Sequence, residues 1–277
     1  MKSVRIRSDI EAMEGYTFIS GTLDALSERL NIPRDQLIKL DTNENLYGPS
    51  QKALEALATL QGDYHIYPDV TSAELRESLA SYTGISAAHI LVGNGADEII
   101  DMILRLFIEP GDTIIDCPPT FTMYSLTASW IGNCDVLRVP RQDDFSLDVE
   151  AIEKAVIESG AKLLFVCNPN NPDGNLTPPE TMQRLLELPV TIVVDEAYIE
   201  FSEFEGFGPW VIETPNLIVI RTLSKWAGLA GLRVGYGLFP LDIIQHLWKI
   251  KHPFNVNVAA DIMAQATLED IDAMQQT

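Results

Sequence analysis

Short apolar runs of this sequence are followed, within a few positions, by residues that could do chemistry. These residues are Phe121, Asn168, Asp195, Tyr198 and Lys225. A lysine amine can form a Schiff base with an aldehyde, and a carboxylate can keep a pyridine nitrogen protonated so that the ring accepts electrons. An amide and a phenol can bind a phenolate oxygen on the same ring, and a phenyl face can stack on it. These residue types predict a site for an aldehyde carried on a pyridine ring.

Other residues near the same runs could hold a phosphate group. The backbone N–H groups of Gly95, Ala96 and Asp97 open a predicted helix, and helix N-termini bind phosphate. Ser224 offers a hydroxyl group, and Arg233 offers a guanidinium group that can form two parallel hydrogen bonds. Together with the lysine, the carboxylate, the amide and the phenol, these groups predict a site for pyridoxal 5′-phosphate.

An alternation of strands and helices would position these residues. Short runs rich in Val and Ile are typical of strands buried on both faces, and apolar residues at helical spacing predict helices between them. The expected strands are 89–92, 113–117, 162–167, 190–194, 216–220 and 233–239, and the expected helices are 23–30, 51–60, 72–82, 97–108, 149–159 and one after Pro240. This order predicts an α/β fold with a mainly parallel central sheet and flanking helices. Ligands bind at the carboxyl ends of such strands, so the site residues should meet at one edge.

Each of these residues has an ordinary structural explanation when it is taken alone. A glycine-rich turn such as 93–95 is commonly only a tight turn, and an aspartate at a strand end, such as Asp195, is often a helix N-cap. A lysine after a strand is more often a solvated surface group than a nucleophile. Because the structural explanation requires six independent coincidences at one sheet edge, the cofactor site is the favoured interpretation.

Composition argues against several other classes of protein. The chain has 277 residues, 46% of them hydrophobic, and its 19 Lys and Arg against 40 Asp and Glu give a formal charge of −21. This acidic balance repels nucleic acid and anionic membranes, so neither is an expected partner. No apolar run approaches the roughly 20 residues that cross a bilayer, and the first residues have no signal-peptide pattern. The three cysteines predict reduced thiols in a cytoplasmic protein, and the four histidines lack metal-ligand spacing, so no metal site is expected.

Seven motifs follow one another along nearly the whole chain. They are KLDTNENLYGPS (39–50), YPD (67–69), VGNGADEII (92–100), CPPTFTMY (117–124), NPNNPDG (168–174), VVDEAY (193–198) and TLSKWAGLAGLRVGY (222–236). On these motifs the chain resembles the fold-type I pyridoxal-phosphate aminotransferases of classes I and II. The last three motifs are specific for the cofactor fold, whereas LDTNENxYGPS and GADEII are similar to the histidinol-phosphate branch of the family.

The resemblance implies a role for each matching residue. Lys225 would carry the Schiff base and then move the proton between the substrate Cα and the cofactor carbon. Asp195 would pair with the pyridine nitrogen. The ring oxygen would be bound by Asn168 and Tyr198, and Phe121 would stack on the ring. The cofactor phosphate would be held by Gly95, Ala96, Asp97, Thr222, Ser224 and Arg233.

The resemblance also implies a homodimer with shared active sites and a second, smaller domain. Tyr67 would reach the cofactor phosphate of the neighbouring subunit, and Tyr16 and Asn43 would line the substrate pocket. The expected domains are an N-terminal arm with part of the small lobe (1–38), a large cofactor-binding domain (39–240), and a linker helix with the start of an incomplete small domain (241–277).

Two features depart from the family pattern. Asp173 stands where a threonine is usual in the NPNNPTG turn. The family's small domain continues further and carries a C-terminal arginine that grips the substrate carboxylate, whereas no Arg or Lys follows Lys251 here. We therefore expect either a fragment of a longer protein or a natural truncation, with a complete cofactor site and an incomplete substrate site.

The resemblance implies transamination between L-histidinol phosphate and 2-oxoglutarate. The products would be imidazole acetol phosphate and L-glutamate, in histidine biosynthesis. Two alternative activities share the lysine motif, namely those of a threonine-phosphate decarboxylase and of an aromatic amino-acid transaminase. A third alternative is a non-catalytic remnant that binds pyridoxal phosphate without turning over a substrate. Small-molecule substrates are expected in every enzymatic case.

Overall fold

The chain separates into two compact units, Met1–Glu44 and Asn45–Thr277. The computed structural model describes residues 4–13, 22–60, 63–131 and 134–274. The predicted domain boundaries after residues 38 and 240 stay predictions.

The first unit contains short helical segments. They are α1 (Ser8–Ala12), α2 (Leu23–Leu30) and the 3-10 turn η1 (Arg34–Gln36). α2 begins after Thr22, whose side chain accepts a hydrogen bond from the backbone N–H of Ala25, and it ends at Asn31 in the left-handed conformation. These two caps satisfy backbone groups that a helix of two turns leaves unpaired. The predicted helix over 23–30 is confirmed.

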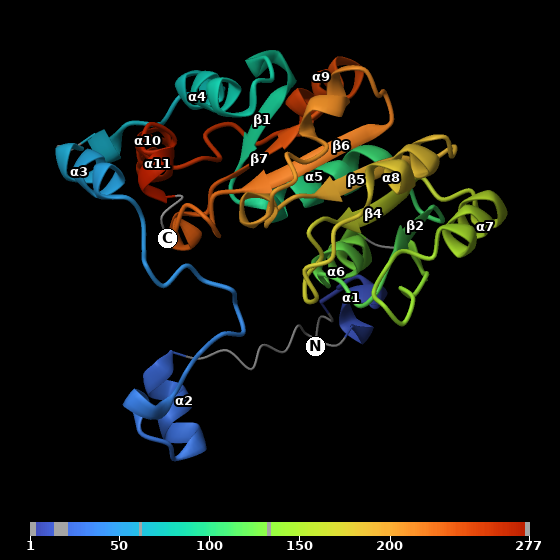
Figure 1. Ribbon diagram of the computed structural model, residues 1–277, viewed down its shortest axis with the longest axis horizontal. Coiled ribbons are helices and arrows are strands. Elements are labelled where there is room, and N and C mark those ends of the chain that lie inside the picture. Colours follow the sequence, from blue (N-terminus) through green and yellow to red (C-terminus); the bar gives the residue numbers. More distant parts are fainter. Residues whose placement is uncertain (1–3, 14–21, 61–62, 132–133, 275–277) are drawn as a thin grey trace. The chain divides into compact units, whose positions relative to one another are not determined.

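A seven-stranded sheet runs through the second unit (Figure 1). Its order is β1–β7–β6–β5–β4–β2–β3. The strands are β1 (Ile90–Gly93), β2 (Thr113–Asp116), β3 (Asp135–Arg138), β4 (Leu163–Cys167), β5 (Thr191–Asp195), β6 (Leu217–Thr222) and β7 (Gly235–Leu238). Neighbouring strands from β3 to β6 run parallel, whereas β7 is antiparallel to both β6 and β1. The predicted α/β fold with a mainly parallel sheet is confirmed.

Burial explains which strands could be predicted. Every residue of β4 is buried, because helices cover both faces of this central strand, and the strand is a continuous apolar run. Strand β3 was not predicted from the sequence. This strand lies at the edge of the sheet, its end residues Asp135 and Arg138 are exposed, and only Val136 within it is partly buried.

Helices pack on both faces of the sheet. On one face the apolar cluster contains side chains of α5 (Ala96–Phe107), α6 (Met123–Ile131) and α9 (Leu241–Ile250). On the other face the cluster contains side chains of α3 (Gln51–Thr59), α4 (Ala73–Thr83), α7 (Val149–Ser159), α8 (Pro179–Leu186) and α10 (Val258–Leu268). Figure 1 shows α7 and α8 toward the β2 side of the sheet, and α3 and α10 beyond its β1 side. The unit is thus a three-layer α/β/α arrangement.

Most helices of the second unit match the expected ranges. The helices predicted at 51–60, 72–82, 97–108, 149–159 and after Pro240 are confirmed as α3, α4, α5, α7 and α9. Helices α6, α8, α10 and the short α11 (Ile271–Met274) were not predicted from the sequence. All three cysteines are free thiols, as expected. Within the described ranges, no helix has the length and apolar character needed to cross a membrane.

Candidate functional site

The carboxyl ends of the central strands meet at one edge of the sheet. Asp195 ends β5, and the backbone N–H of Asn168, which follows β4, donates to the Asp195 carbonyl oxygen at 2.8 Å. At the same edge, Gly235 of β7 pairs with both Thr222 of β6 and Gly93 of β1. Polar residues predicted from the sequence therefore follow neighbouring strands at one place in the fold.

Asp195 is a buried carboxyl group with a donor on each oxygen. Its Oδ2 accepts a hydrogen bond from the hydroxyl group of Tyr124 at 2.7 Å, and its Oδ1 accepts one from the backbone N–H of Ala197 at 3.0 Å. Burial raises the pKa of Asp195 to about 6, although both hydrogen bonds act in the opposite direction. Such a group can exchange a proton with a ring nitrogen near neutral pH.

Asn168 is fully buried and has one amide atom left to pair. Its Oδ1 accepts a hydrogen bond from the backbone N–H of Thr177 at 2.6 Å. Among the described residues, its Nδ2 has no hydrogen-bond partner. Leaving a buried donor unpaired costs about 1–3 kcal/mol. An acceptor oxygen on a bound molecule would remove this cost, and the ring oxygen of pyridoxal phosphate is such an acceptor.

Lys225 lies three residues after the end of β6 and is half-buried. Its Nζ lies 5.8 Å from the centre of the Tyr198 ring, so the structure brings the predicted lysine and phenol together. The turn between β6 and Lys225 is held by Thr222, whose Oγ1 accepts a hydrogen bond from the backbone N–H of Ser224 at 3.1 Å. Both Thr222 and Ser224 are buried. The amine of Lys225 thus extends from a turn that is buried and held by a hydrogen bond.

Gly95, Asp97 and Arg233 lie together at the start of α5. Gly95 has a φ of +81°, and a Cβ at this position would lie 2.6 Å from Nη2 of Arg233. The same Nη2 donates to Oδ2 of Asp97 at 2.9 Å. A Cβ on Gly235 would lie 2.6 Å from the backbone N of Ala96, so β7 lies directly against the helix N-terminus. Backbone N–H groups and a guanidinium group in this arrangement fit a phosphate.

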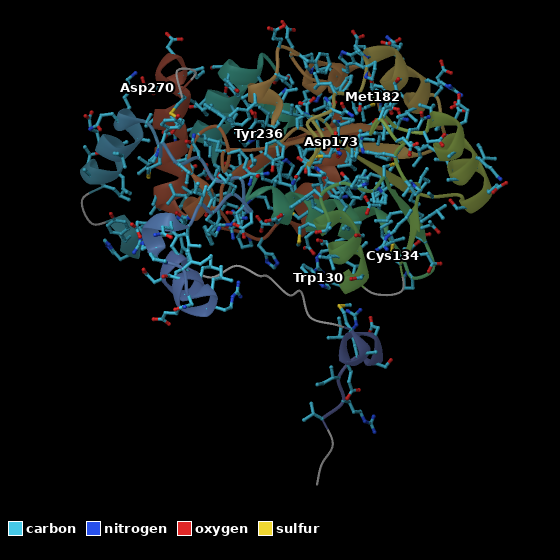
Figure 2. The ribbon with its side chains drawn as sticks, turned by 60° about the horizontal axis from the view of Figure 1, so that its bottom comes forward. Trp130, Cys134, Asp173, Met182, Tyr236 and Asp270 are labelled. Carbon is cyan, nitrogen blue, oxygen red and sulfur yellow. The ribbon has the colours of Figure 1, made fainter. Side chains whose placement is uncertain are left out.

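Asp173 stabilises the turn that follows β4. Its Oδ1 accepts a hydrogen bond from the backbone N–H of Asn175 at 2.9 Å, and its other oxygen accepts one from the side-chain amide of Asn170. Asp173 is labelled in Figure 2. The aspartate therefore supplies an acceptor oxygen in this turn, which is why the departure from threonine is compatible with the fold.

The structure does not place three of the predicted residues in this cluster. Tyr67 is 77% exposed, and its ring stacks on that of Phe254 with 4.5 Å between the ring centres. Asn43 belongs to the first unit, where its backbone is left-handed with a φ of 50°. Tyr16 lies outside the described residues. The roles expected for these three residues stay predictions.

Two groups of side chains beside the site were not predicted from the sequence. Tyr124 donates to Asp195, and its ring makes an edge contact with the partly buried Phe121 at 5.6 Å. Glu196 and Arg221 form a buried ion pair. Available signals were the tyrosine three residues after Phe121 and the charged residues that follow two apolar runs within two positions.

The sheet order and the lysine in the turn after β6 agree with the resemblance to fold-type I aminotransferases that the motifs indicate. Residues 35–277 match the model of the family described as aminotransferase class I and II. The chain belongs to this family.

Named relatives cover most of the chain. The histidinol-phosphate aminotransferase of Roseiflexus castenholzii (strain DSM 13941 / HLO8) is 49% identical over 98% of this chain and 74% of its own length. The chloroplastic histidinol-phosphate aminotransferase of Nicotiana tabacum is 50% identical over 89% of this chain, which spans 59% of that relative. A crystal structure of histidinol-phosphate aminotransferase from Sinorhizobium meliloti, in complex with pyridoxal-5′-phosphate, has a TM-score of 0.87 at 29% identity, covering 98% of this chain and 73% of that one.

Proposed function

We propose that this chain binds pyridoxal 5′-phosphate at the sheet edge and transfers an amino group between L-histidinol phosphate and 2-oxoglutarate. The buried amide of Asn168 carries the proposal, because its Nδ2 has no partner among the described residues and it lies beside Asp195. These two groups match an oxygen and a nitrogen of one ring. When bound, the cofactor supplies an aldehyde that takes up an amine and a ring that stores the electron pair released at the substrate Cα.

Each residue of the site has its own role toward the cofactor and the substrate. Asp195 holds a proton at the ring nitrogen, and Lys225 supplies the amine that moves a proton to and from the substrate Cα. The start of α5 and Arg233 bind the phosphate. The guanidinium group of Arg233 lies directly against Gly95 at the start of this helix, which supports this role. Phe121 covers one face of the ring and excludes water from it.

Reduction with borohydride tests the cofactor site. The protein is mixed with pyridoxal phosphate, reduced, digested and analysed by mass spectrometry. We expect the adduct on Lys225, because this lysine follows a buried strand and lies over Tyr198. Lys249 and Lys251 in the same digest serve as internal controls. An adduct on either of these lysines in place of Lys225 would contradict the assignment.

A panel of amino donors tests the substrate. The relatives named above, at 49% and 50% identity, support L-histidinol phosphate as the donor. The loaded protein is given L-histidinol phosphate, O-phospho-L-threonine or L-phenylalanine, and the cofactor absorbance is followed. L-Histidinol phosphate should change the absorbance fastest. Release of CO₂ from O-phospho-L-threonine would favour the decarboxylase, a faster change with L-phenylalanine the aromatic transaminase, and no change with any donor the non-catalytic remnant.

We also propose that the chain forms a homodimer. The resemblance to the family supports this proposal, and the aromatic side chains of Tyr47, Tyr64 and Tyr67 are 78%, 62% and 77% exposed, so they are accessible to a second chain. Sedimentation of the purified chain over a range of concentrations measures its mass. A species with the mass of one chain at all concentrations would contradict the homodimer. The cytoplasmic location stays a prediction.

A further inference from the structure

The hydroxyl group of Tyr124 lies 2.7 Å from Oδ2 of Asp195. Tyr124 is 0% exposed and Asp195 is 3% exposed. Burial raises the pKa of Tyr124 well above its usual value, so the phenol keeps its proton and is the donor of this hydrogen bond. Because the N–H of Ala197 donates to Oδ1, each oxygen of Asp195 has one donor fixed by the protein.

Aromatic packing fixes the direction in which this hydroxyl points. Tyr124 lies in the first turn of α6, and its ring stacks on Phe165 of β4 with 4.8 Å between ring centres and 12° between planes. The edge contact with Phe121 has an interplanar angle of 80°. A ring held on two sides keeps its hydroxyl in one place. Tyr124 thereby connects the residue expected to cover the cofactor ring with the carboxyl group expected at its nitrogen.

The surroundings of Asp195 make this donor important. Burial and the nearby carboxylates of Asp97 and Glu196 raise the pKa of Asp195. The hydroxyl of Tyr124 and the N–H of Ala197 lower it, and the hydroxyl has the larger effect of the two. The thiol of Cys167, on β4, also lies beside the Tyr124 hydroxyl and is a titratable group. Without Tyr124, the balance at Asp195 moves toward the protonated acid.

We propose that Tyr124 is a positioning residue, which keeps the carboxylate of Asp195 charged and oriented so that Asp195 can hold a proton on the ring nitrogen of pyridoxal phosphate. The inference rests on the proposed function, because it requires this cofactor in the site. Tyr124 acts through Asp195. Removing its hydroxyl leaves one oxygen of a buried carboxylate without its donor, and the shared proton then moves from the ring nitrogen toward Asp195.

A pair of variants and a pair of probes test this role. Tyr124→Phe removes the hydroxyl and keeps the ring on Phe165. Tyr236→Phe is the matched control, since Tyr236, labelled in Figure 2, is 1% exposed and belongs to the apolar cluster on the other face of the sheet from Tyr124. The probes are pyridoxal phosphate and the analogue in which C–H replaces the ring nitrogen, and dissociation constants are measured for both with each protein. A general loosening of the site would weaken the binding of both probes equally.

We expect Tyr124→Phe to weaken the binding of pyridoxal phosphate roughly tenfold or more relative to the binding of the analogue. Tyr236→Phe should leave the ratio of the two dissociation constants unchanged. In an Asp195→Asn background, Tyr124→Phe should no longer change the ratio, because the hydroxyl acts through the carboxylate. An unchanged ratio in Tyr124→Phe would overturn the inference while the proposed function stands. Failure of the unaltered chain to bind pyridoxal phosphate would overturn both.

The ring nitrogen itself gives a second readout that is independent of turnover. With ¹⁵N-labelled pyridoxal phosphate, the nitrogen chemical shift reports whether the ring is protonated. Between about pH 6 and pH 9, the unaltered protein and Tyr236→Phe should keep the protonated shift. In Tyr124→Phe the chemical shift should move toward the unprotonated value across this whole range, because the proton then lies on Asp195. Identical titrations in the three proteins would show that Tyr124 only fills space.

Discussion

Glu196 and Arg221 form an ion pair inside the protein, with Oε2 of Glu196 2.8 Å from Nη2 of Arg221. Their side chains are 0% and 8% exposed. Successive residues of an extended chain point in opposite directions, so Asp195 faces Tyr124 while the next residue, Glu196, faces Arg221 on β6. The carboxyl end of β5, which carries Asp195, is therefore held by side-chain contacts on both of its faces.

Breaking this ion pair should destabilise the fold. Arg221→Met leaves the carboxylate of Glu196 buried without its partner, and such a loss costs about 3–5 kcal/mol in the free energy of unfolding. Urea denaturation measures it. Arg184→Met is the control, because Arg184 pairs with Glu153 on the surface and should cost at most about 1 kcal/mol. Equal losses in the two variants would contradict the prediction.

Glu200 is a partly buried carboxyl group with an incomplete set of hydrogen-bond partners. Its Oε1 accepts a hydrogen bond from the hydroxyl of Tyr82 at 3.1 Å, whereas its Oε2 has no partner within the described ranges. Burial raises the pKa of Glu200 from 4.5 to about 7, although nearby Arg221 acts against this rise. Because the pKa is higher in the folded protein than in the unfolded chain, this group's contribution to stability is complete below about pH 4.5. It is lost as the pH rises through about 7.

Glu200→Gln should therefore reduce the pH dependence of stability. A glutamine cannot ionise, so the free energy of unfolding should fall by about 3 kcal/mol less between pH 5 and pH 8 than in the parent protein. Denaturation of cofactor-free protein at several pH values measures this difference. Glu203→Gln, at an exposed position nearby, should behave like the parent. A Glu200→Gln profile that matches the parent would show that Glu200 does not titrate in this range.

Residues that follow buried strands could be located from the sequence, whereas their partners could not. Asn168, Asp195 and Lys225 come directly or shortly after apolar runs, and a run that is buried on both faces leaves its signature in every residue. Tyr124 precedes Asp195 by 71 residues, and their hydrogen bond depends on how α6 packs against β4. No local pattern contains that information.

A charged residue in an apolar strand is a related case. Arg221 lies within the continuously buried β6, and the sequence shows it plainly. Its position gave no indication of whether it would contact solvent, a ligand or a carboxylate. The packing of β5 beside β6 decides this, because the parallel register brings the end of β5 beside Ile220. The fold is thus predictable from local runs, but the buried polar network depends on long-range pairing.

The contact between Gly95 and Arg233 predicts the effect of adding one methyl group. Gly95→Ala places a Cβ 2.6 Å from Nη2 of Arg233 at a φ of +81°. We expect the displaced guanidinium to weaken pyridoxal phosphate binding roughly tenfold or more, since a charged hydrogen bond contributes about 1.5–3 kcal/mol. Fluorescence titration with the cofactor measures the change.

Gly84→Ala is the matched control for this variant. Gly84 also has a positive φ, of +70°, but no atom lies within 4 Å of a Cβ built there. The control should lose about 1–2 kcal/mol of stability through backbone strain and keep its cofactor affinity. If both variants weaken cofactor binding to the same extent, strain alone explains the loss and Arg233 does not contact the phosphate.

Tyr67 is exposed, so its side chain is accessible to a neighbouring subunit, and its substitution tests whether active sites are shared. If its hydroxyl binds the cofactor phosphate of the neighbouring subunit, Tyr67→Phe should weaken cofactor binding roughly tenfold, through the loss of a charge-assisted hydrogen bond. Tyr64→Phe removes a second exposed phenol three residues away and should leave the affinity unchanged. Titration of each purified variant with pyridoxal phosphate measures the difference.

Mixing Tyr67→Phe chains with Lys225→Ala chains then shows which subunit supplies each residue. A mixed dimer has one site with both Tyr67 and Lys225 intact and one site that lacks both. Random pairing of equal amounts makes about half of the dimers mixed, so about a quarter of all sites should regain normal cofactor affinity and normal reduction onto Lys225. If Tyr67 instead serves the site of its own chain, mixing creates no intact site, and the mixture behaves as the sum of the two separate variants. That additive result would contradict shared active sites.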